Sequence, residues 1–216
     1  MKERPILFSA PMVRAILQGK KTQTRRIVKP QPELAEGAWY WCHPRYNNGI
    51  GVQYFHTNAE SAAEKMATVC PYGVAGDRLW VRETWFDNVA SDDGDEAKTP
   101  ARCVYRADGE FIEQFPEEYM EGRWSPSIHM PRWASRITLV VVAVRVERLQ
   151  DITNNDAIEE GCDGERWLDS DGSEGRGVEP WEQFRDLWHK INGPESWSAN
   201  PWVWVVEFRK LEGGAT

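Results

Sequence analysis

The chain has 216 residues, which is enough for one well-buried core and short for two, since domains usually contain about 100–200 residues. Its formal net charge of -8 argues against indiscriminate binding to nucleic-acid backbones, because such binding needs a basic surface. No stretch approaches the roughly 20 apolar residues that cross a bilayer, and the charged start does not resemble a signal peptide, so we expect a soluble, cytoplasmic protein without a membrane partner.

The charge is unevenly placed along the chain. Glu3 is the single acidic side chain in the first thirty residues, which are rich in lysine and arginine. The acid-rich segments follow later, at Asp87–Glu96, Glu110–Glu121 and Asp151–Glu174. A localised positive site on an acidic body suits a small anionic or polar ligand, or one short nucleic-acid segment.

The first predicted element is a short amphipathic helix. Ser9 is a suitable N-cap, apolar residues recur at helical spacing within Met12–Leu17, and Gly19 supplies a stop. The composition of Lys20–Arg26 then favours an extended conformation, which ends before Pro30.

The middle of the chain has weaker patterns. Residues 31–70 are aromatic and Asn/Gly-rich without a clear period, which indicates an ordered insertion and no second core. Arg78–Trp85 alternates as a strand does, and Ala101–Arg106 is a second strand candidate. Between them, Asp87–Thr99 is typical of an exposed acidic loop.

The last third carries the clearest signals. Arg136–Leu149 contains a long β-branched run that predicts a buried strand. Thr153–Glu160 begins with a capping box and predicts a brief helix, and Phe184–Ile191 predicts an amphipathic one. Trp202–Phe208 alternates as a terminal strand. We therefore predict an α+β fold built around a small mixed or antiparallel β-barrel, with a few short helices.

The densest cluster of functional groups is the segment Gly19–Arg26. In an extended chain Thr24 and Arg26 share one face and Lys21 lies on the other, so a twist or the preceding turn must bring Lys21 to Thr24. A lysine desolvated in a pocket loses its proton and can activate a hydroxyl. The alternative is a solvated basic strand, since perturbed sites are the minority of charged clusters.

The pattern G-x-K-x-x-T-x-R, formed by Gly19, Lys21, Thr24 and Arg26 after a short helix, resembles the signature segment of the ASCH family, a branch of the PUA-like β-barrels. Further segments resemble the longer members of that family found in phages and prophages. These segments are Gly76–Glu83, Trp124–Arg136 and Leu149–Gly161. The resemblance implies a single ASCH (PUA-like) domain over residues 1–216, with insertions near 33–70 and 86–126.

A compact bacterial member of this family is an amidohydrolase that removes the acetyl group from N(4)-acetylcytidine with a lysine, a threonine and a glutamate. The resemblance implies these roles for Lys21 and Thr24. Glu159 and Glu160 are both candidates for the glutamate, and we select Glu160 because the Leu-x-x-Ile-Thr start of its helix brings it into register. Thr24 Oγ would attack the acyl carbon and neutral Lys21 would accept its proton, while Glu160 holds the lysine or passes a proton to the leaving amine. Arg26 would orient a carbonyl or a phosphate.

A second candidate binding region is the segment Trp124–Arg136. It combines a titratable ring, guanidinium groups and a stacking surface, a set suited to holding a base and its phosphate. The predicted substrate-binding residues there are His129, Arg132, Trp133 and Arg136, joined by Arg82 and Glu83 of the resembling strand. The alternative is a Pro-flanked loop with a packed tryptophan and a surface arginine.

No cofactor or metal is expected. The chain contains four cysteines, which show neither CxxC spacing nor the density of a disulfide scaffold. We therefore expect free thiols in a reducing compartment. The spacing of Cys42, His43, His56 and Cys70 matches no standard zinc finger or ribbon.

Three functions compete at this stage. The first is an amidohydrolase acting on a modified cytidine-type nucleoside or base, the second a non-catalytic PUA-like reader of RNA or a modified base, and the third a metal-dependent ribonuclease. The presence of both Lys21 and Thr24 favours the enzyme, because a reader has no need of that pair. The expected partner is a small nucleoside or an RNA base, with single-stranded RNA as a further candidate, and a monomer is favoured.

Overall fold

The computed structural model describes residues 1–35, 38–41, 53–55, 59–87, 98–109, 124–164 and 177–211. Its strands are β1 (Glu3–Leu7), β2 (Gln23–Ile27), β3 (Glu33–Ala35), β4 (Ala38–Trp41), β5 (Gln53–Phe55), β6 (Arg78–Arg82), β7 (Trp85–Asp87), β8 (Cys103–Tyr105), β9 (Thr138–Arg148) and β10 (Trp202–Lys210). Its α-helices are α1 (Ala10–Leu17), α2 (Ala59–Ala67), α5 (Asn154–Glu159), α6 (Pro180–Asn192) and α7 (Glu195–Ser198). Short 3-10 turns occur at Pro100–Arg102, Ser127–His129, Arg132–Ala134 and Leu149–Asp151.

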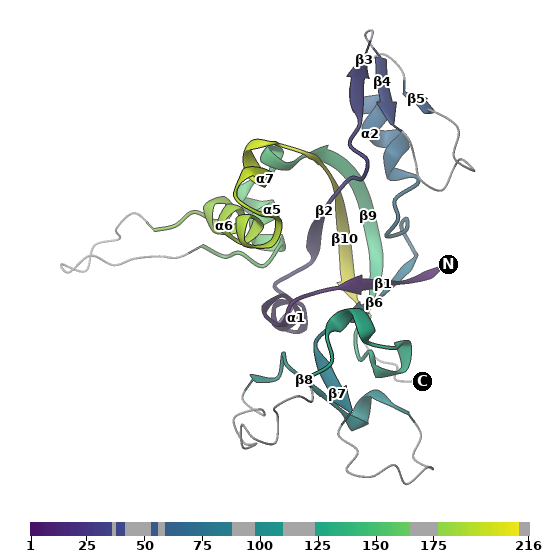
Figure 1. Ribbon diagram of the computed structural model, residues 1–216, viewed down its shortest axis with the longest axis vertical. Coiled ribbons are helices and arrows are strands. Elements are labelled where there is room, and N and C mark those ends of the chain that lie inside the picture. Colours follow the sequence, from purple (N-terminus) through teal and green to yellow (C-terminus); the bar gives the residue numbers. More distant parts are fainter. Residues whose placement is uncertain are drawn as a thin grey trace, which may run out of the picture.

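A five-stranded mixed sheet forms the centre of the molecule, in the order β1-β6-β9-β10-β2 (Figure 1). β1 and β6 run parallel, and the remaining neighbours are antiparallel. The predicted α+β class is thereby confirmed. Among the described strands the sheet is open, because its edge strands β1 and β2 do not pair with each other. Helix α1 connects β1 to β2. The predicted closure into a barrel is therefore not observed among the described strands.

The strongest sequence patterns correspond to observed elements. The predicted strands at Arg136–Leu149 and Trp202–Phe208 are β9 and β10, and the predicted helix at Phe184–Ile191 lies within α6. In α5 the Thr153 side chain accepts a hydrogen bond from the Asp156 amide, which confirms the capping box. The sequence did not predict β1, β3, β4, β5, α2 or α7, since short strands and helices within aromatic, polar segments give little periodicity.

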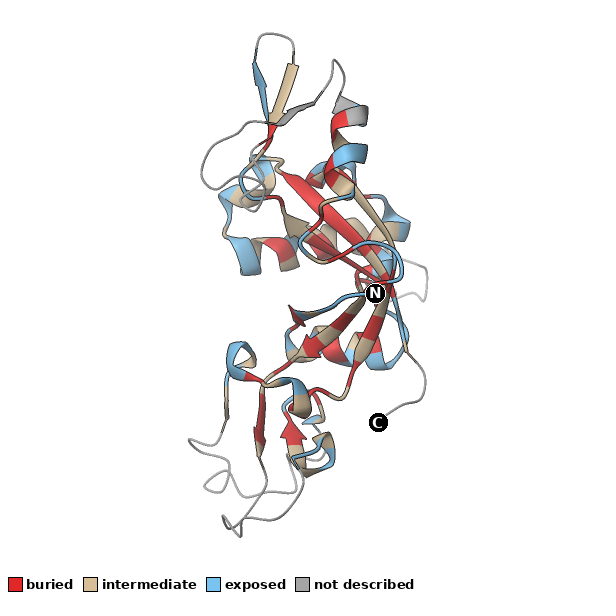
Figure 2. Ribbon diagram, turned by 90° about the vertical axis from the view of Figure 1, so that its right-hand side faces the viewer, coloured by how far each residue is buried: buried red, intermediate tan, exposed pale blue. Residues whose placement is uncertain are grey.

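Both faces of β10 are buried, and each belongs to a different hydrophobic cluster. Trp204, Val206 and Phe208 join the larger cluster with residues of β1, α1, β6 and β9. Val203 and Val205 on the opposite face pack with residues of α5 and α6. Figure 2 shows the buried residues concentrated along these strands, with exposed residues on the outer sides of the helices. The helical layer formed by α5 and α6 therefore covers one face of the sheet beside β2.

Two smaller sheets extend from opposite ends of the central one (Figure 1). β3, β4 and β5 form the first, near α2, within the predicted insertion at 33–70. β7 and β8 form the second, where a third cluster contains Trp85, Tyr105 and Met130. Most of the predicted acidic loop at Asp87–Thr99 and of the insertion near 86–126 lies outside the described residues. Among the described residues, no helix has both the length and the apolar character needed to cross a membrane.

Candidate functional site

Two turns bring Lys21 against the end of α5. Gly19 follows α1 with a φ of 74°, a left-handed conformation that favours glycine. The amides of Lys20 and Lys21 then donate to the Ala15 carbonyl at 2.9 and 3.1 Å, which directs the chain into β2. After α5, Gly161 has a φ of 91°, and a Cβ there would lie only 3.2 Å from the Ala15 Cβ. Glycine at this position allows the two turns to pack closely.

Lys21 and Glu160 form a buried ion pair. Lys21 Nζ lies 2.6 Å from Glu160 Oε2 and donates a second hydrogen bond of 2.9 Å to the Glu160 backbone oxygen. The exposed fraction is 0% for the lysine side chain and 4% for the glutamate side chain. Burial lowers the pKa of Lys21, and the charge of Glu160 opposes this only in part. Lys21 therefore gives up a proton more readily than an exposed lysine does.

The other side chains on this face of β2 also contact α5 or its surroundings. Arg25 Nη2 lies 2.6 Å from Glu147 Oε1, and Arg25 Nη1 lies 3.5 Å from Glu160 Oε1. Gln23 accepts a hydrogen bond from Arg25 and donates one of 2.9 Å to Glu159. The arginine side chain is fully buried, at 0% exposure, and its charge is balanced by carboxylates. This network fixes Glu160 relative to the strand.

A second arginine extends the network away from Glu160. Arg145 Nη2 lies 2.6 Å from Asp156 Oδ1 and Arg145 Nε lies 2.9 Å from Glu147 Oε2, and Arg145 also pairs with Glu207. Burial alone would raise the pKa of Asp156, but hydrogen bonds from Thr153 and the charge of Arg25 outweigh burial, so this pKa lies below its ordinary value. Asp156 stays ionised and ties the start of α5 to the sheet.

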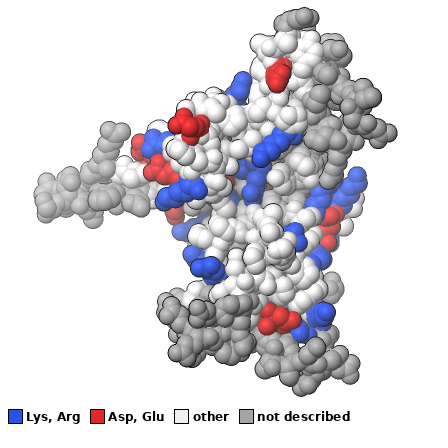
Figure 3. Space-filling view, in the orientation of Figure 1, with Lys and Arg blue, Asp and Glu red and all other residues white. Residues whose placement is uncertain are grey.

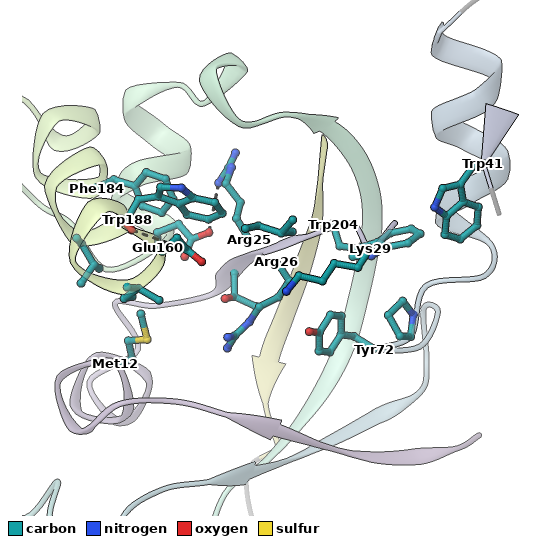
Figure 4. A pocket seen from close by; sticks show the side chains of 16 residues that line it. Met12, Arg25, Arg26, Lys29, Trp41, Tyr72, Glu160, Phe184, Trp188 and Trp204 are labelled. Carbon is teal, nitrogen blue, oxygen red and sulfur yellow. Dashed lines mark hydrogen bonds and ion pairs between the residues drawn. The ribbon is translucent and has the colours of Figure 1, made fainter. Parts of the chain in front are cut away.

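A cavity of about 410 Å³ lies along β2, at the edge of the central sheet. Glu160, Phe184 and Trp188 lie on one side of it, and Trp41 and Tyr72 lie on the other (Figure 4). The volume is in the range of sites for small ligands, which are usually about 300–1,000 Å³ and lined mainly by apolar and aromatic side chains. The cavity is therefore large enough for one small ligand.

Thr24 and Glu160 both line this cavity, whereas Lys21 lies behind Glu160 and is not among the lining residues. In the β2–β10 register Thr24 pairs with Val206 and Arg25 pairs with Val205. Successive side chains of a strand point to opposite faces, so Thr24 faces away from the Arg25 network. Thr24 is 3% exposed. Within the described part of the chain, its hydroxyl forms no hydrogen bond, and Lys21 Nζ donates instead to Glu160. This arrangement has no hydrogen bond through which Thr24 would pass a proton directly to Lys21.

Arg26 also lines the cavity, as its predicted role requires. Its Nη2 donates a hydrogen bond of 2.6 Å to the Leu7 carbonyl, and its guanidinium carbon lies 5.3 Å from the centre of the Phe8 ring. These contacts hold the side chain against the end of β1.

The structure places Arg82, Glu83 and Arg136 elsewhere. None of them lines the cavity along β2. Arg136 forms forked hydrogen bonds with Glu83, at 3.0 and 3.1 Å, and with Asp108, both at 2.8 Å. Arg82 Nε donates to the Met130 carbonyl at 2.9 Å. These contacts join the segment before β9 to β6 and to the chain after β8, as expected for groups that stabilise the fold.

Arg132, Trp133 and His129 lie in the same outer region. Arg132 pairs with Glu3 at 2.9 Å, and the Trp133 ring packs edge-on against Trp85 with centroids 5.4 Å apart. His129 is exposed. None of these three residues lines the cavity along β2. The Trp124–Arg136 segment thus matches the alternative reading, a Pro-flanked loop with a packed tryptophan and a surface arginine.

Several cavity residues were not anticipated from the sequence. Phe184 and Trp188 have the helical spacing of core residues, and they do pack in the core, but they also form one wall of the cavity. Lys29 and Tyr72 lie in segments without periodicity, so no local pattern marked them. Arg25 was grouped with the basic strand, and nothing in its neighbours indicated complete burial.

Comparisons with protein-family models, with curated proteins and with solved structures give no match for this chain. Within the residues that the structure describes, no group of three or more His, Cys, Asp or Glu side chains is arranged to hold a metal ion. Cys42, His43 and His56, considered above for zinc, lie outside those residues, and Cys70 is a buried free thiol.

Proposed function

We propose that this protein is an amidohydrolase of the ASCH (PUA-like) type that removes an acyl group from the exocyclic amine of a modified cytidine-type nucleoside or base. The observation that carries the proposal is the buried Lys21–Glu160 pair beside a cavity that Thr24 also lines. In this proposal the open central sheet corresponds to part of a PUA-like barrel.

The placement of the three side chains suggests how they share the work. Glu160 reaches the cavity and Lys21 lies behind it, so Glu160 is the group that exchanges protons with the substrate. Lys21 is a positioning residue. Its side chain orients the carboxylate through the 2.6 Å contact. Thr24 supplies the nucleophile, because its hydroxyl has no competing hydrogen-bond partner among the described residues.

The reaction proceeds in two steps. Thr24 Oγ attacks the acyl carbon, and its proton passes through a water in the cavity to Glu160, which delivers a proton to the exocyclic nitrogen as the C–N bond breaks. Water then attacks the acyl-threonine ester, again with Glu160 as the base, and releases the carboxylic acid and the free hydroxyl. The sum for N(4)-acetylcytidine is one water consumed and cytidine and acetic acid formed.

The aromatic walls favour a second candidate, a non-catalytic reader of a modified base. Trp41, Tyr72 and Trp204 line the cavity opposite α6 or at its base, and aromatic rings hold bases by stacking whatever the chemistry that follows. A reader would bind the modified base and release it unchanged.

A chromatographic assay of purified protein with N(4)-acetylcytidine tests the proposal. Thr24→Val keeps the shape of a buried side chain and removes the hydroxyl, so we expect a loss of about 100-fold or more in kcat with the fold intact. Thr22→Val is the matched control, since Thr22 neighbours the site without lining the cavity. Full activity of Thr24→Val contradicts the mechanism, and binding of the wild-type protein without turnover favours the reader.

A further inference from the structure

Two cations in the cavity wall, Arg26 and Lys29, differ from the basic side chains that surround Glu160. Lys21, Arg25 and Arg145 are each paired with a carboxylate. For Arg26 and Lys29, no carboxylate of the described residues lies within ion-pair distance. Both side chains line the cavity.

The cavity therefore has a positive excess. Its one acidic lining residue, Glu160, is already neutralised by Lys21, and the third cation in the wall, Arg25, is neutralised by Glu147. Arg26 and Lys29 remain. Figure 3 shows Lys and Arg side chains at the centre of the face that Figure 1 presents. In a chain with a formal net charge of -8, unpaired cations at one site indicate an anionic ligand.

The positions of the two cations suit a phosphate at the rim. Lys29 is exposed and its side chain extends toward Arg26 (Figure 4). Arg26 is anchored by the Leu7 carbonyl through one nitrogen, Nη2. Among the described residues its Nη1 has no acceptor. A guanidinium with a donor to spare next to a free ammonium is a common way of holding a phosphate.

We propose that the cavity binds a cytidine-type nucleotide, with Arg26 and Lys29 holding its phosphate and the aromatic walls holding its base. This inference rests on the proposed function for the cytosine ring and adds the phosphate. The volume of about 410 Å³ accommodates one nucleotide, and the two cations suit a single phosphate, so we infer a nucleoside monophosphate. An internal nucleotide of RNA carries the same chemistry and is distinguished by the experiment.

Calorimetric titration with cytidine and with cytidine 5′-monophosphate tests the phosphate contact. We expect the wild-type protein to bind the monophosphate at least about tenfold more tightly, the effect of one charge-assisted hydrogen bond. Lys29→Ala should remove most of this preference and leave the affinity for cytidine unchanged. Lys65→Ala removes an exposed lysine of α2 and should change neither affinity. Equal binding of the two ligands, or equal losses in both variants, overturns the proposal.

Two further measurements separate this proposal from the hydrolase. Equal kcat/KM for N(4)-acetylcytidine and its 5′-monophosphate overturns the phosphate site and leaves the hydrolase standing. A phosphate preference in binding without any turnover supports the phosphate site and contradicts the hydrolase. A cytidine trinucleotide that binds tenfold more tightly than the monophosphate overturns the assignment to a mononucleotide and assigns the phosphate to a strand.

Discussion

Replacing Lys21 by methionine tests the central feature of the site, the buried ion pair. The substitution preserves the apolar stem and leaves Glu160, with a side chain only 4% exposed, facing Arg25 at 3.5 Å as its remaining partner. Breaking a buried pair by removing one member costs about 3–5 kcal/mol. The loss of stability is limited, because Glu160 can bind a proton and become neutral. At pH 7, protonation costs about 1.4 kcal/mol for each pH unit above an ordinary glutamate pKa of about 4.3, which sets the limit at about 4 kcal/mol.

The same reasoning predicts a pH dependence. Burial of Glu160 without Lys21 favours the neutral carboxyl, so the folded variant binds an extra proton that the unfolded chain does not hold. The free energy of unfolding of Lys21→Met should therefore rise by up to about 1.4 kcal/mol per unit as the pH falls from 7 toward about 4.3, relative to the wild type. Urea unfolding followed by tryptophan fluorescence measures it.

Lys20→Met is the matched control. Lys20 is the adjacent lysine, and its ion pair with Asp163 is exposed, with side chains 55% and 59% accessible. Such pairs contribute about 0–1 kcal/mol. The double variant Lys21→Met/Glu160→Gln removes the unpaired charge and should recover at least about 1 kcal/mol of the loss. A loss below about 1 kcal/mol for Lys21→Met, or one that is the same at pH 5 and pH 7, would refute the reasoning.

Three further predictions concern groups outside the cavity. Hydrogen bonds, of which the one from the Lys2 amide has the largest effect, lower the pKa of Asp77 from 3.8 to about 2. The loss of stability in Asp77→Asn, measured by urea unfolding, should therefore be full at pH 6 and should shrink as the pH falls from 3.8 through about 2. Burial raises the pKa of Cys70 to about 12 and of Cys162 to about 11, so both thiols should react with iodoacetamide at pH 8 far more slowly in the native protein than in urea; equal rates would contradict their burial. Arg136→Lys loses the forked contacts with two carboxylates and should destabilise the fold by about 1–3 kcal/mol, while turnover of N(4)-acetylcytidine by the folded variant is unchanged.

Local patterns were sufficient for the elements that dominate the sheet and its cover. The β-branched composition of β9 and the alternation of β10 favour strands, and the apolar spacing of α6 has the period of a helix. Glycine at position 19 likewise marks the end of α1 in the sequence itself. The identity of Glu160 as the partner of Lys21 came from the resemblance, and the structure brings these residues together across 139 positions of the chain.

The amino-acid sequence by itself indicated the longest strands and helices, β9, β10 and α6, because side-chain periodicity and β-branched composition are local. It also placed Lys21, Thr24 and Arg26 in one short segment. Tertiary structure alone decided which charges are buried. Arg25 and Arg132 are the same residue type, yet one is enclosed beneath α6 and the other is nearly half exposed, at 46%. Burial depends on what packs over a side chain from distant parts of the chain, and so does the cavity, whose walls come from α6, β2 and Tyr72.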